Sequence, residues 1–332
     1  MTRDIMVVGA ARTAIGSFGG SLRDMPLSQL ATTAVKAALD RRGVEPATVG
    51  HVTMGNVIPT EPKDAYLSRV AALKAGLPQE VPAFNVNRLC GSGLQAIVSA
   101  AQTIALGDAD VAIGAGAESM SRGPYLSTGI RWGERMGDSR MVDYMLAALH
   151  DPFDDIHMGI TAENVAARRQ ISRADQDALA AESHRRAANA IAEGRFREQI
   201  VPIEIVSRKG TRIFDTDEHV RADTSVESLA KMRPAFKPDG TVTAGNASGI
   251  NDAAAAVVLA EAGVAESRGL KPLARLVGYA HAGVAPDEMG IGPIPASRKV
   301  LERTGLSVGD LDVIESNEAF AAQACAVSRE LG

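Results

Sequence analysis

The stretch Asn85-Val86-Asn87-Arg88-Leu89-Cys90-Gly91-Ser92-Gly93 places a cysteine between an extended run and a helical pattern. Residues 81–86 combine Pro, Phe and Val and predict a strand, while residues 94–104 carry apolar side chains at helical spacing. The unpaired N–H groups and the dipole at a helix N-terminus attract negative charge, which favours a thiolate there. The stretch therefore predicts a strand-turn-helix junction with Cys90 as a nucleophile.

Two interpretations of Cys90 compete. An unpaired cysteine is most often a small buried hydrophobe that is present for packing. Gly91 and Gly93, which we place in the turn, favour the nucleophile, because glycines let a ligand approach the backbone closely. The second cysteine, Cys325, lies in the alanine-rich helical run 319–327 and is expected in the core.

Composition narrows the class of protein. A chain of 332 residues suggests two or more packed units, and the low aromatic content of 4% suits an α/β interior of small and branched side chains. The net charge of −5, with both signs interspersed, offers no basic face for nucleic acid. The two cysteines give neither a disulfide framework nor metal-ligand spacing, which favours a reducing compartment.

No targeting or membrane segment is recognised. The first five residues lead directly into a strand and do not resemble a signal peptide. No apolar run approaches the roughly 20 residues that a membrane helix needs. We therefore expect a cytoplasmic enzyme without membrane association.

Strands and helices alternate through the first 120 residues. This alternation predicts a largely parallel sheet covered by helices. A stretch without clear period follows at 121–140, as is usual for functional or oligomer-contact loops. Helical patterns resume at 141–149, 162–170 and 173–192. Residues 121–243 are therefore predicted to be an insertion. After it, residues 253–260 are small and apolar, and a new strand is expected to begin at 273–278. The expected early elements are strands at 5–10, 49–54 and 110–115, and helices at 27–39 and 64–74.

An internal repeat links the two ends of the chain. The sequence LDRRGV at 39–44 is echoed by LERTGL at 301–306, and in both places a helix is expected to end at Gly before a strand, at 49–54 and at 311–316. Chance similarity is the alternative explanation. If the repeat is real, the second half ends before its counterpart of the Cys90 junction, and we expect that half to be incomplete.

Four further clusters combine polar residues with small ones: 157–164, which begins with His; 218–223, which holds Arg221; 243–252, rich in Gly, Asn and Ser; and 315–321, which holds Asn317. Each alone is explained as a turn or a helix cap. Together with the Cys90 stretch they resemble the thiolases, and in particular the acetyl-CoA acetyltransferase and β-ketothiolase group. The resemblance runs along the whole chain, through 12–16, 87–93, 116–121, 245–249, 292–296 and 317–320.

The resemblance implies a layered αβαβα fold of two similar halves with a loop domain between them. The first half is expected at 1–120 plus 244–271, the inserted loop domain, with coenzyme A (CoA) and oligomer contacts, at 121–243, and the second half, truncated, at 272–332. Homodimers or homotetramers are implied, with the loop 122–140 matching the tetramer-forming loop. No cofactor or metal is implied, since the partners are small acyl-CoA substrates.

Cys90 matches the family's acyl-carrying nucleophile, which accepts an acyl group from a thioester and passes it to a second nucleophile. The second nucleophile is the carbanion of acetyl-CoA in condensation, which forms acetoacetyl-CoA, and the thiol of CoA in thiolysis of a 3-ketoacyl-CoA. Asn317 matches the residue that holds a water in the enolate-stabilising site. The family contacts CoA at His157, Met158, Arg221, Ser228, Phe236, Ala244, Ser248 and Met289, and Phe320 lines the pocket.

Two family segments are absent from this sequence. These are a Gly-His-Pro segment, whose His activates the nucleophile, and a Cys-x-Gly-Gly-Gly segment, whose Cys is a second acid/base. Neither His281 nor Cys325 lies in a matching motif. A poorly active CoA-binding or partner-binding remnant is therefore one alternative, and a ketoacyl synthase-type condensing enzyme is another, although its two-histidine set finds no matching motif. Acyl-chain length and reaction direction stay open.

Overall fold

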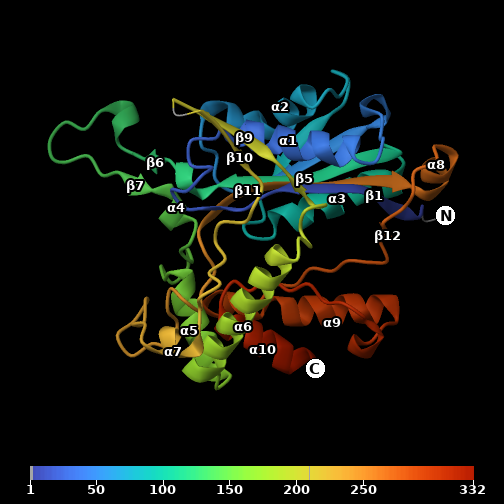
Figure 1. Cartoon of the computed structure of the whole chain (residues 1–332). Helices are drawn as coiled ribbons and strands as arrows, with labels where there is room; N and C mark the ends of the chain where they lie inside the picture. The colour runs from blue at the N-terminus through green and yellow to red at the C-terminus, as the bar shows by residue number, and fades with distance from the viewer. Residues whose placement is uncertain (1–2, 209) are drawn as a thin grey trace. The chain divides into compact units, whose positions relative to one another are not determined.

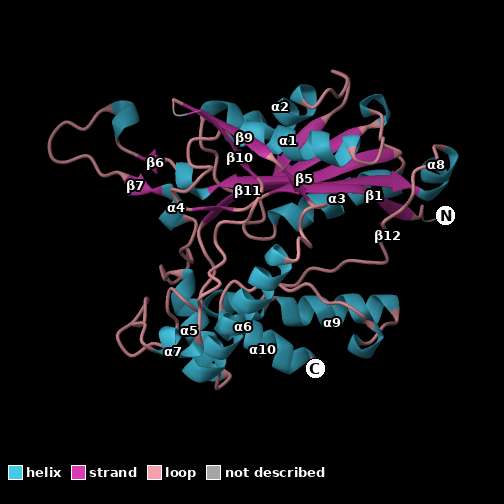
Figure 2. Cartoon of the chain, viewed as in Figure 1, coloured by secondary structure: helices cyan, strands magenta, loops and turns pink. Residues whose placement is uncertain are grey.

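The computed structural model describes residues 3–208 and 210–332 (Figure 1). Residues 1 and 2, where the chain was predicted to lead into its first strand, lie outside this description. The chain divides into two compact units. The first is built on a β-sheet and the second on helices (Figure 2). The first unit comprises Met1–Ala148, Arg195–His219 and Ile250–Leu276, and the second comprises Leu149–Gly194, Val220–Gly249 and Val277–Gly332.

The sheet of the first unit has the strand order β12-β1-β11-β5-β3-β4, with β2 paired to β11 and β8 paired to β1. The predicted strands near 5–10, 49–54, 81–86 and 110–115 are confirmed, with bounds that differ by a few residues. The strands are β1 (Ile5–Thr13), β2 (Gly16–Ser17), β3 (His51–Gly55), β4 (Ala83–Val86), β5 (Val111–Ser119), β8 (Ile200–Val201), β11 (Asn251–Glu261) and β12 (Ala274–Arg275).

The prediction of a largely parallel sheet is wrong, because the sheet is mixed. β3 runs parallel to both β4 and β5, as the alternating pattern required. β11, however, pairs antiparallel with β1 and with β5, and it occupies the position between them. Strand direction depends on the end from which the chain re-enters the sheet, and the apolar run 253–260 carries no information about that.

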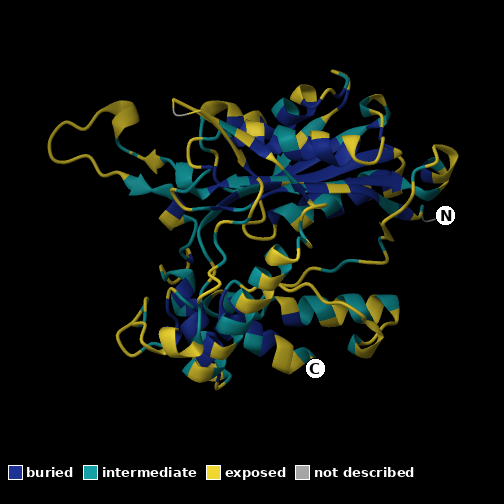
Figure 3. Ribbon diagram, in the orientation of Figure 1, coloured by how far each residue is buried: buried dark blue, intermediate teal, exposed yellow. Residues whose placement is uncertain are grey.

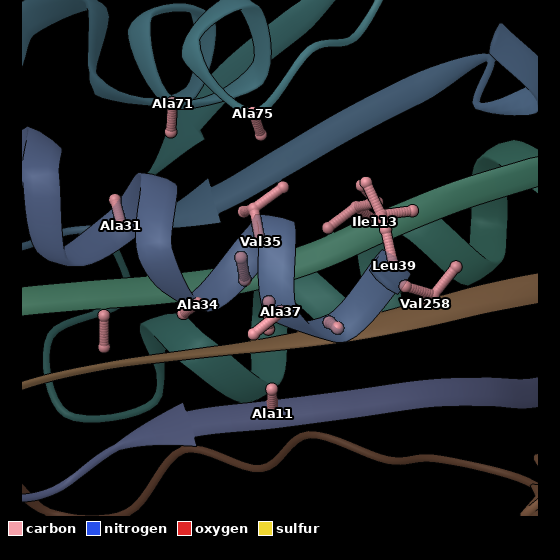
Figure 4. Close-up of a cluster of buried hydrophobic side chains, with 14 of the residues drawn as sticks. Ala11, Ala31, Ala34, Val35, Ala37, Leu39, Ala71, Ala75, Ile113 and Val258 are labelled. Carbon is pink, nitrogen blue, oxygen red and sulfur yellow. The ribbon is translucent and has the colours of Figure 1, made fainter. Parts of the chain in front are cut away.

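Two apolar clusters cover opposite faces of this sheet. Helices α1 (Leu27–Asp40) and α2 (Leu67–Lys74) pack on one face, where Ile113 and Val258 are buried (Figure 4). Helix α3 (Ser92–Leu106) packs on the other face, where the neighbouring residues Ala112 and Leu259 are buried. Both faces are buried (Figure 3), which explains the nearly continuous apolar sequence of these strands.

Within the described part of the chain, the stretch Leu89–Leu106 is long and apolar enough, by length and composition, to be a candidate membrane span. It contains α3, which contacts β3 and β5. A helix that packs against the core sheet of a globular unit passes the same test, so the finding carries little weight.

The first unit also carries short peripheral elements. Residues 141–149 were predicted to be one helix, which is wrong: a two-residue strand precedes a single helical turn there. Asp143 caps this turn by accepting from Met145 N at 2.9 Å, and so ends the extended stretch. The peripheral elements are β6 (Tyr125–Leu126), β7 (Val142–Asp143), α4 (Tyr144–Ala147), β9 (Ile203–Ser207), β10 (Gly210–Phe214) and α8 (Ala262–Ser267).

The second unit is helical. The predicted helix 173–192 is confirmed with identical bounds as α6, and Ser172 and Asp175 form the expected capping box at its start. The helix predicted at 162–170 begins earlier, because His157 caps it by accepting from Gly159 N. The helices are α5 (Met158–Arg168), α6 (Arg173–Ala192), α7 (Val226–Ala230), α9 (Pro293–Thr304) and α10 (Ala321–Leu331).

The internal repeat is reproduced at the helix ends but not in the strands. Gly43 and Gly305 both adopt positive φ, at 61° and 71°, as the residues that end a helix often do. The predicted strand 311–316 is wrong, since no strand pairing is found for it among the described residues. A strand needs a neighbour for its N–H and C=O groups, and β3, its counterpart, has one on each side. The strand predicted at 273–278 is likewise reduced to β12.

Candidate active site

Cys90 lies exposed in the turn that joins β4 to α3 in the first unit. Ser92, the first residue of α3, is buried and braces this turn from inside. Its hydroxyl accepts from the N–H of Arg88 at 2.8 Å and donates to the carbonyl of Leu89 at 2.7 Å. The residues on the N-terminal side of Cys90 are thus held by the residue that starts the helix. This confirms the predicted strand-turn-helix junction and excludes the buried-packing interpretation of Cys90.

The backbone of this turn is strained at a residue that the sequence did not single out. Leu89 has φ 45°, in the left-handed region that non-glycine residues rarely adopt. Such a conformation costs on the order of 1 kcal/mol and is concentrated at functional sites. Gly91 has an ordinary φ of −85° and forms the helix N-cap. Gly93 lies inside α3 and not in the turn, which corrects the predicted position.

Two glycines of the sheet allow α3 to start so close to the strands. A side chain on Gly55 of β3 would meet the backbone of Ser92 at 2.6 Å. A side chain on Gly116 of β5 would lie 3.4 Å from Cα of Gly93. The parallel strands β3 and β5 therefore support the first turn of α3 directly.

Glu118, near the end of β5, is a half-buried acid that we did not predict as a functional residue. Its carboxylate accepts from the N–H groups of Val57 and Ile58, both at 2.9 Å, and from the amide of Asn56 at 3.0 Å. Burial raises the pKa of Glu118 to about 7, and these hydrogen bonds oppose the shift. Its position in the apolar run after residue 110 was the available signal, because a lone acid there is unusual.

Three of the predicted CoA-contacting side chains form an aromatic stack in the second unit. The rings of His157 and Phe236 are stacked with centroids 4.7 Å apart, and Phe236 meets Phe320 edge-on at 6.2 Å. Nδ1 of His157 accepts from Gly159 N at 3.0 Å, so the ring proton is assigned to Nε2. Burial and the neighbouring His150 lower the pKa of His157, which favours the neutral ring. Met158 packs on the same cluster.

The segment 241–248, which carries Ala244 and Ser248, is held by two buried acids that the sequence analysis missed. Glu163 of α5 accepts from the N–H groups of Thr241, at 2.8 Å, and of Val242, at 2.9 Å. Asp177 of α6 accepts from the side chain of Asn246 at 2.9 Å. Buried acids on helices are rare unless they are paired. Ala244 and Ser248 are exposed, as ligand contacts must be.

Asn317 is joined to this segment through the residues that follow it. Ala247 and Phe320 form a β-bridge, and Ser248 N donates to Ala319 O at 3.0 Å. Residues 315–318 border a shallow hollow that is open to solvent, and Asn317 is exposed there. The structure thus brings the predicted enolate residue, the aromatic stack and the segment 241–248 into one region of the second unit.

The other predicted contacts are Arg221, Ser228 and Met289, all in the second unit. Arg221 is exposed, and its N–H donates to Nδ1 of His184 at 3.2 Å. Ser228 belongs to the capping box of α7 with Ser225, so it has a local structural task as well. Met289 is half-buried in the 3-10 helix Pro286–Ile291. Cys325 is part-buried in α10, where burial raises the pKa of its thiol, which suits the predicted core residue and not a nucleophile.

Comparison with known proteins gives consistent matches along the chain. Residues 5–263 match the thiolase N-terminal domain, and residues 270–332 match the thiolase C-terminal domain. The β-ketothiolase BktB of Cupriavidus necator is 64% identical over 100% of this chain and 84% of its own. An acetyl-CoA acetyltransferase of Pseudomonas aeruginosa is 50% identical over 99% of this chain and 84% of its own.

Solved structures agree with this match. The acetyl-CoA acetyltransferase of Bacillus anthracis superimposes with a TM-score of 0.97 at 46% identity, over 99% of this chain and 84% of that one. Human mitochondrial 3-ketoacyl-CoA thiolase in complex with CoA superimposes with a TM-score of 0.96 at 44% identity, over 99% and 83%. The expected thiolase fold is confirmed.

The second half is recognisable, since the C-terminal domain match covers residues 270–332. The prediction that this half is truncated is not supported by that match. The matches cover both units along almost their full length, at identities far above the range in which only a fold can be assigned. The chain belongs to the thiolase family of acyl-CoA acyltransferases.

Proposed function

We propose that Cys90 carries the acyl group in a two-step transfer between CoA thioesters. In the first step the thiolate of Cys90 attacks the thioester carbonyl; the new C–S bond forms as the bond to CoA breaks, and the CoA thiolate takes up a proton. The single observation that carries the proposal is the exposed position of Cys90 in a braced, strained turn at the start of α3.

In the second step the acyl group leaves Cys90 for another nucleophile. The carbanion of acetyl-CoA forms a C–C bond and gives acetoacetyl-CoA. In thiolysis the thiolate of Cys90 instead attacks the 3-keto carbonyl of a 3-ketoacyl-CoA, the C2–C3 bond breaks, and the departing acetyl-CoA carbanion takes up a proton. The thiol of CoA then takes the shortened acyl group from Cys90. Both directions regenerate the thiolate of Cys90, so ping-pong kinetics follow. No cofactor takes part, because the thioester itself activates the acyl group.

We assign the enolate and coenzyme contacts to the second unit. Asn317 holds a water that donates to the enolate oxygen, and Phe320 closes the pocket beside it. Ala244 and Ser248 meet the pantetheine arm, and Arg221 meets the nucleotide end. The remaining contacts are His157, Met158, Ser228, Phe236 and Met289. The aromatic stack with Met158 packed on it, and the bridge between Ala247 and Phe320 that joins it to segment 241–248, support this assignment.

We assign no residue of this chain to the base that deprotonates Cys90 or to the second acid/base group. The sequence contains neither a Gly-His-Pro nor a Cys-x-Gly-Gly-Gly segment. Transfer of an acyl group to Cys90 and complete turnover are therefore separate expectations. We expect acylation of Cys90 by this chain, with slow or absent turnover.

The proposed division of the chain is a first half at 1–120 plus 244–271, an inserted loop domain at 121–243 and a second half from 272. We further propose a cytoplasmic homodimer or homotetramer. The loop 122–140 exposes Trp132 and Met136 almost completely, at 90% and 97%, which suits burial against a second copy. The edge strand β4 also exposes Phe84 and has one neighbour in the sheet.

The experiment is incubation with isotope-labelled acetyl-CoA followed by peptide mass analysis. We expect the acetyl label on the peptide that contains Cys90, its loss in Cys90→Ala, and its retention in Cys325→Ala. Label on another residue refutes the assignment. Formation of acetoacetyl-CoA is measured in the same mixture, because it reports turnover independently of acylation.

A further inference from the structure

Two neighbouring residues of α6 bond to two different loops of the second unit. Ser183 Oγ donates to the carboxylate of Glu318 at 2.6 Å. Glu318 follows Asn317 directly in the chain. Nδ1 of His184 accepts the backbone N–H of Arg221 at 3.2 Å. The first bond holds the loop that carries the enolate residue. The second holds the loop assigned to the nucleotide end of CoA.

The loop around Arg221 is exposed. Arg221 and the two residues after it are exposed, and the carbonyl of Arg221 accepts from Thr224 N at 3.2 Å in a simple turn. The following segment is tied to α6 further along, where the guanidinium of Arg173 donates to the carbonyl oxygens of Leu229 and Met232, at 2.6 and 3.1 Å. The hydrogen bond from Arg221 N to His184 holds the start of the loop on α6 in the same way.

We propose that His184 is a positioning residue for coenzyme A: by holding the backbone of Arg221 on α6, it places that guanidinium for the nucleotide end of the ligand. The inference rests on the proposed function, in which Arg221 meets that end. His184 makes no contact with the ligand in this scheme.

The physical reason is preorganisation. A loop that is already in its bound conformation loses less conformational entropy when the ligand binds. Acceptance by Nδ1 requires a ring whose proton sits on Nε2. An asparagine can present its carbonyl oxygen at a similar distance from the helix, so it can replace the acceptor; alanine and leucine cannot.

Loss of the His184 hydrogen bond should weaken binding of the nucleotide end of CoA and leave the packing of the second unit unchanged. The net free energy of one such hydrogen bond corresponds to roughly a three- to tenfold change in the dissociation constant of a ligand whose binding depends on it. We therefore expect His184→Ala to raise the dissociation constant for CoA by about that factor. Binding of pantetheine 4′-phosphate, which lacks the adenosine bisphosphate, should not change.

The test is isothermal titration of wild type, His184→Ala and His184→Asn with CoA and with pantetheine 4′-phosphate. Asn189→Ala is the matched control, since Asn189 is an exposed residue of the same helix. Circular dichroism and thermal melting establish that each variant is folded. Support consists of weaker CoA binding in His184→Ala, recovery in His184→Asn, and unchanged binding of pantetheine 4′-phosphate.

The other outcomes each reject a different statement. If wild type does not bind CoA at all, the proposed function fails. If wild type binds CoA and His184→Ala binds it equally well, the positioning role is wrong. If both ligands weaken to the same extent in His184→Ala, or His184→Asn behaves like His184→Ala, His184 has a general structural role and the proposal is again wrong.

Discussion

Removal of the Glu163 carboxylate should destabilise the second unit and the segment that carries Ala244 and Ser248. Glu163 is 2% exposed and accepts from two backbone N–H groups, Thr241 N and Val242 N. It also accepts from the Thr241 hydroxyl at 3.1 Å. Glu163→Ala removes all of these bonds. In Glu163→Gln an amide oxygen in the place of Oε1 still accepts from both backbone N–H groups, and the amide nitrogen takes the place of Oε2, which accepts from Thr241 N and the Thr241 hydroxyl.

The size of the effect follows from the number of donors that lose their acceptor. Leaving one buried donor without a partner costs about 1–3 kcal/mol. The Thr241 hydroxyl can still accept from Gln176 Nε2 at 2.9 Å, so the two backbone groups dominate. With partial access of water, Glu163→Ala should lose roughly 3–4 kcal/mol of unfolding free energy. Glu163→Gln should lose about 1 kcal/mol or less, since one oxygen accepts from both backbone donors.

Urea unfolding followed by circular dichroism at 222 nm measures the free energy of unfolding, and titration with CoA measures the consequence for the site. We expect Glu163→Ala to bind CoA more weakly, because segment 241–248 is no longer held in place, and Glu163→Gln to stay close to wild type. Glu266→Gln is the control: Glu266 is an exposed glutamate of α8, and its change should lie within about 0.5 kcal/mol of wild type. A Glu163→Ala stability equal to that of the control would refute the reasoning.

Three further predictions concern the two units separately. Ser248→Trp should weaken CoA binding at least about tenfold by filling the pantetheine channel, with the alkylation rate of Cys90 unchanged; equal CoA affinity would contradict the assignment. Burial raises the pKa of Glu118 from 4.5 to about 7. Its contribution to the free energy of unfolding is therefore complete below pH 4.5 and is lost as the pH rises to about 7. Urea unfolding of Glu118→Gln should lack this decline between the two pH values. Burial also raises the pKa of Cys325, so iodoacetamide near neutral pH should alkylate Cys90 first, in a fast phase of the reaction. Cys325→Ser should leave the rate of this fast phase unchanged. Loss of the fast phase in Cys325→Ser would show that Cys325 reacts first.

Local sequence determined the elements whose residues need only their neighbours in the chain. Helix α6 was predicted with its bounds, because Ser172 and Asp175 form a capping box and Gly194 ends the run within a few residues. The strand-turn-helix around Cys90 was also predicted, and its cysteine is exposed as a nucleophile requires. The motif resemblance indicated the family before any coordinates were considered.

Tertiary structure decided what depends on residues far apart in sequence. The antiparallel place of β11 between β1 and β5 follows from how the chain re-enters the sheet, and no pattern within 251–261 specifies it. The segment 311–316 has the composition of a strand but no strand partner among the described residues. Composition sets a preference for extended backbone, whereas pairing requires a neighbour.

The supporting residues of the site were invisible to the sequence for the same reason. Glu163 and Asp177 look like ordinary helix acids, yet burial and distant backbone or amide donors give them their roles. The strain at Leu89 likewise appears only once Ser92 closes the turn around it. The sequence by itself indicated the family and singled out Cys90 as the candidate nucleophile, through a motif read locally. The fold determined which residues hold that motif and the proposed coenzyme contacts in place, because burial and long-range hydrogen bonds exist only in three dimensions.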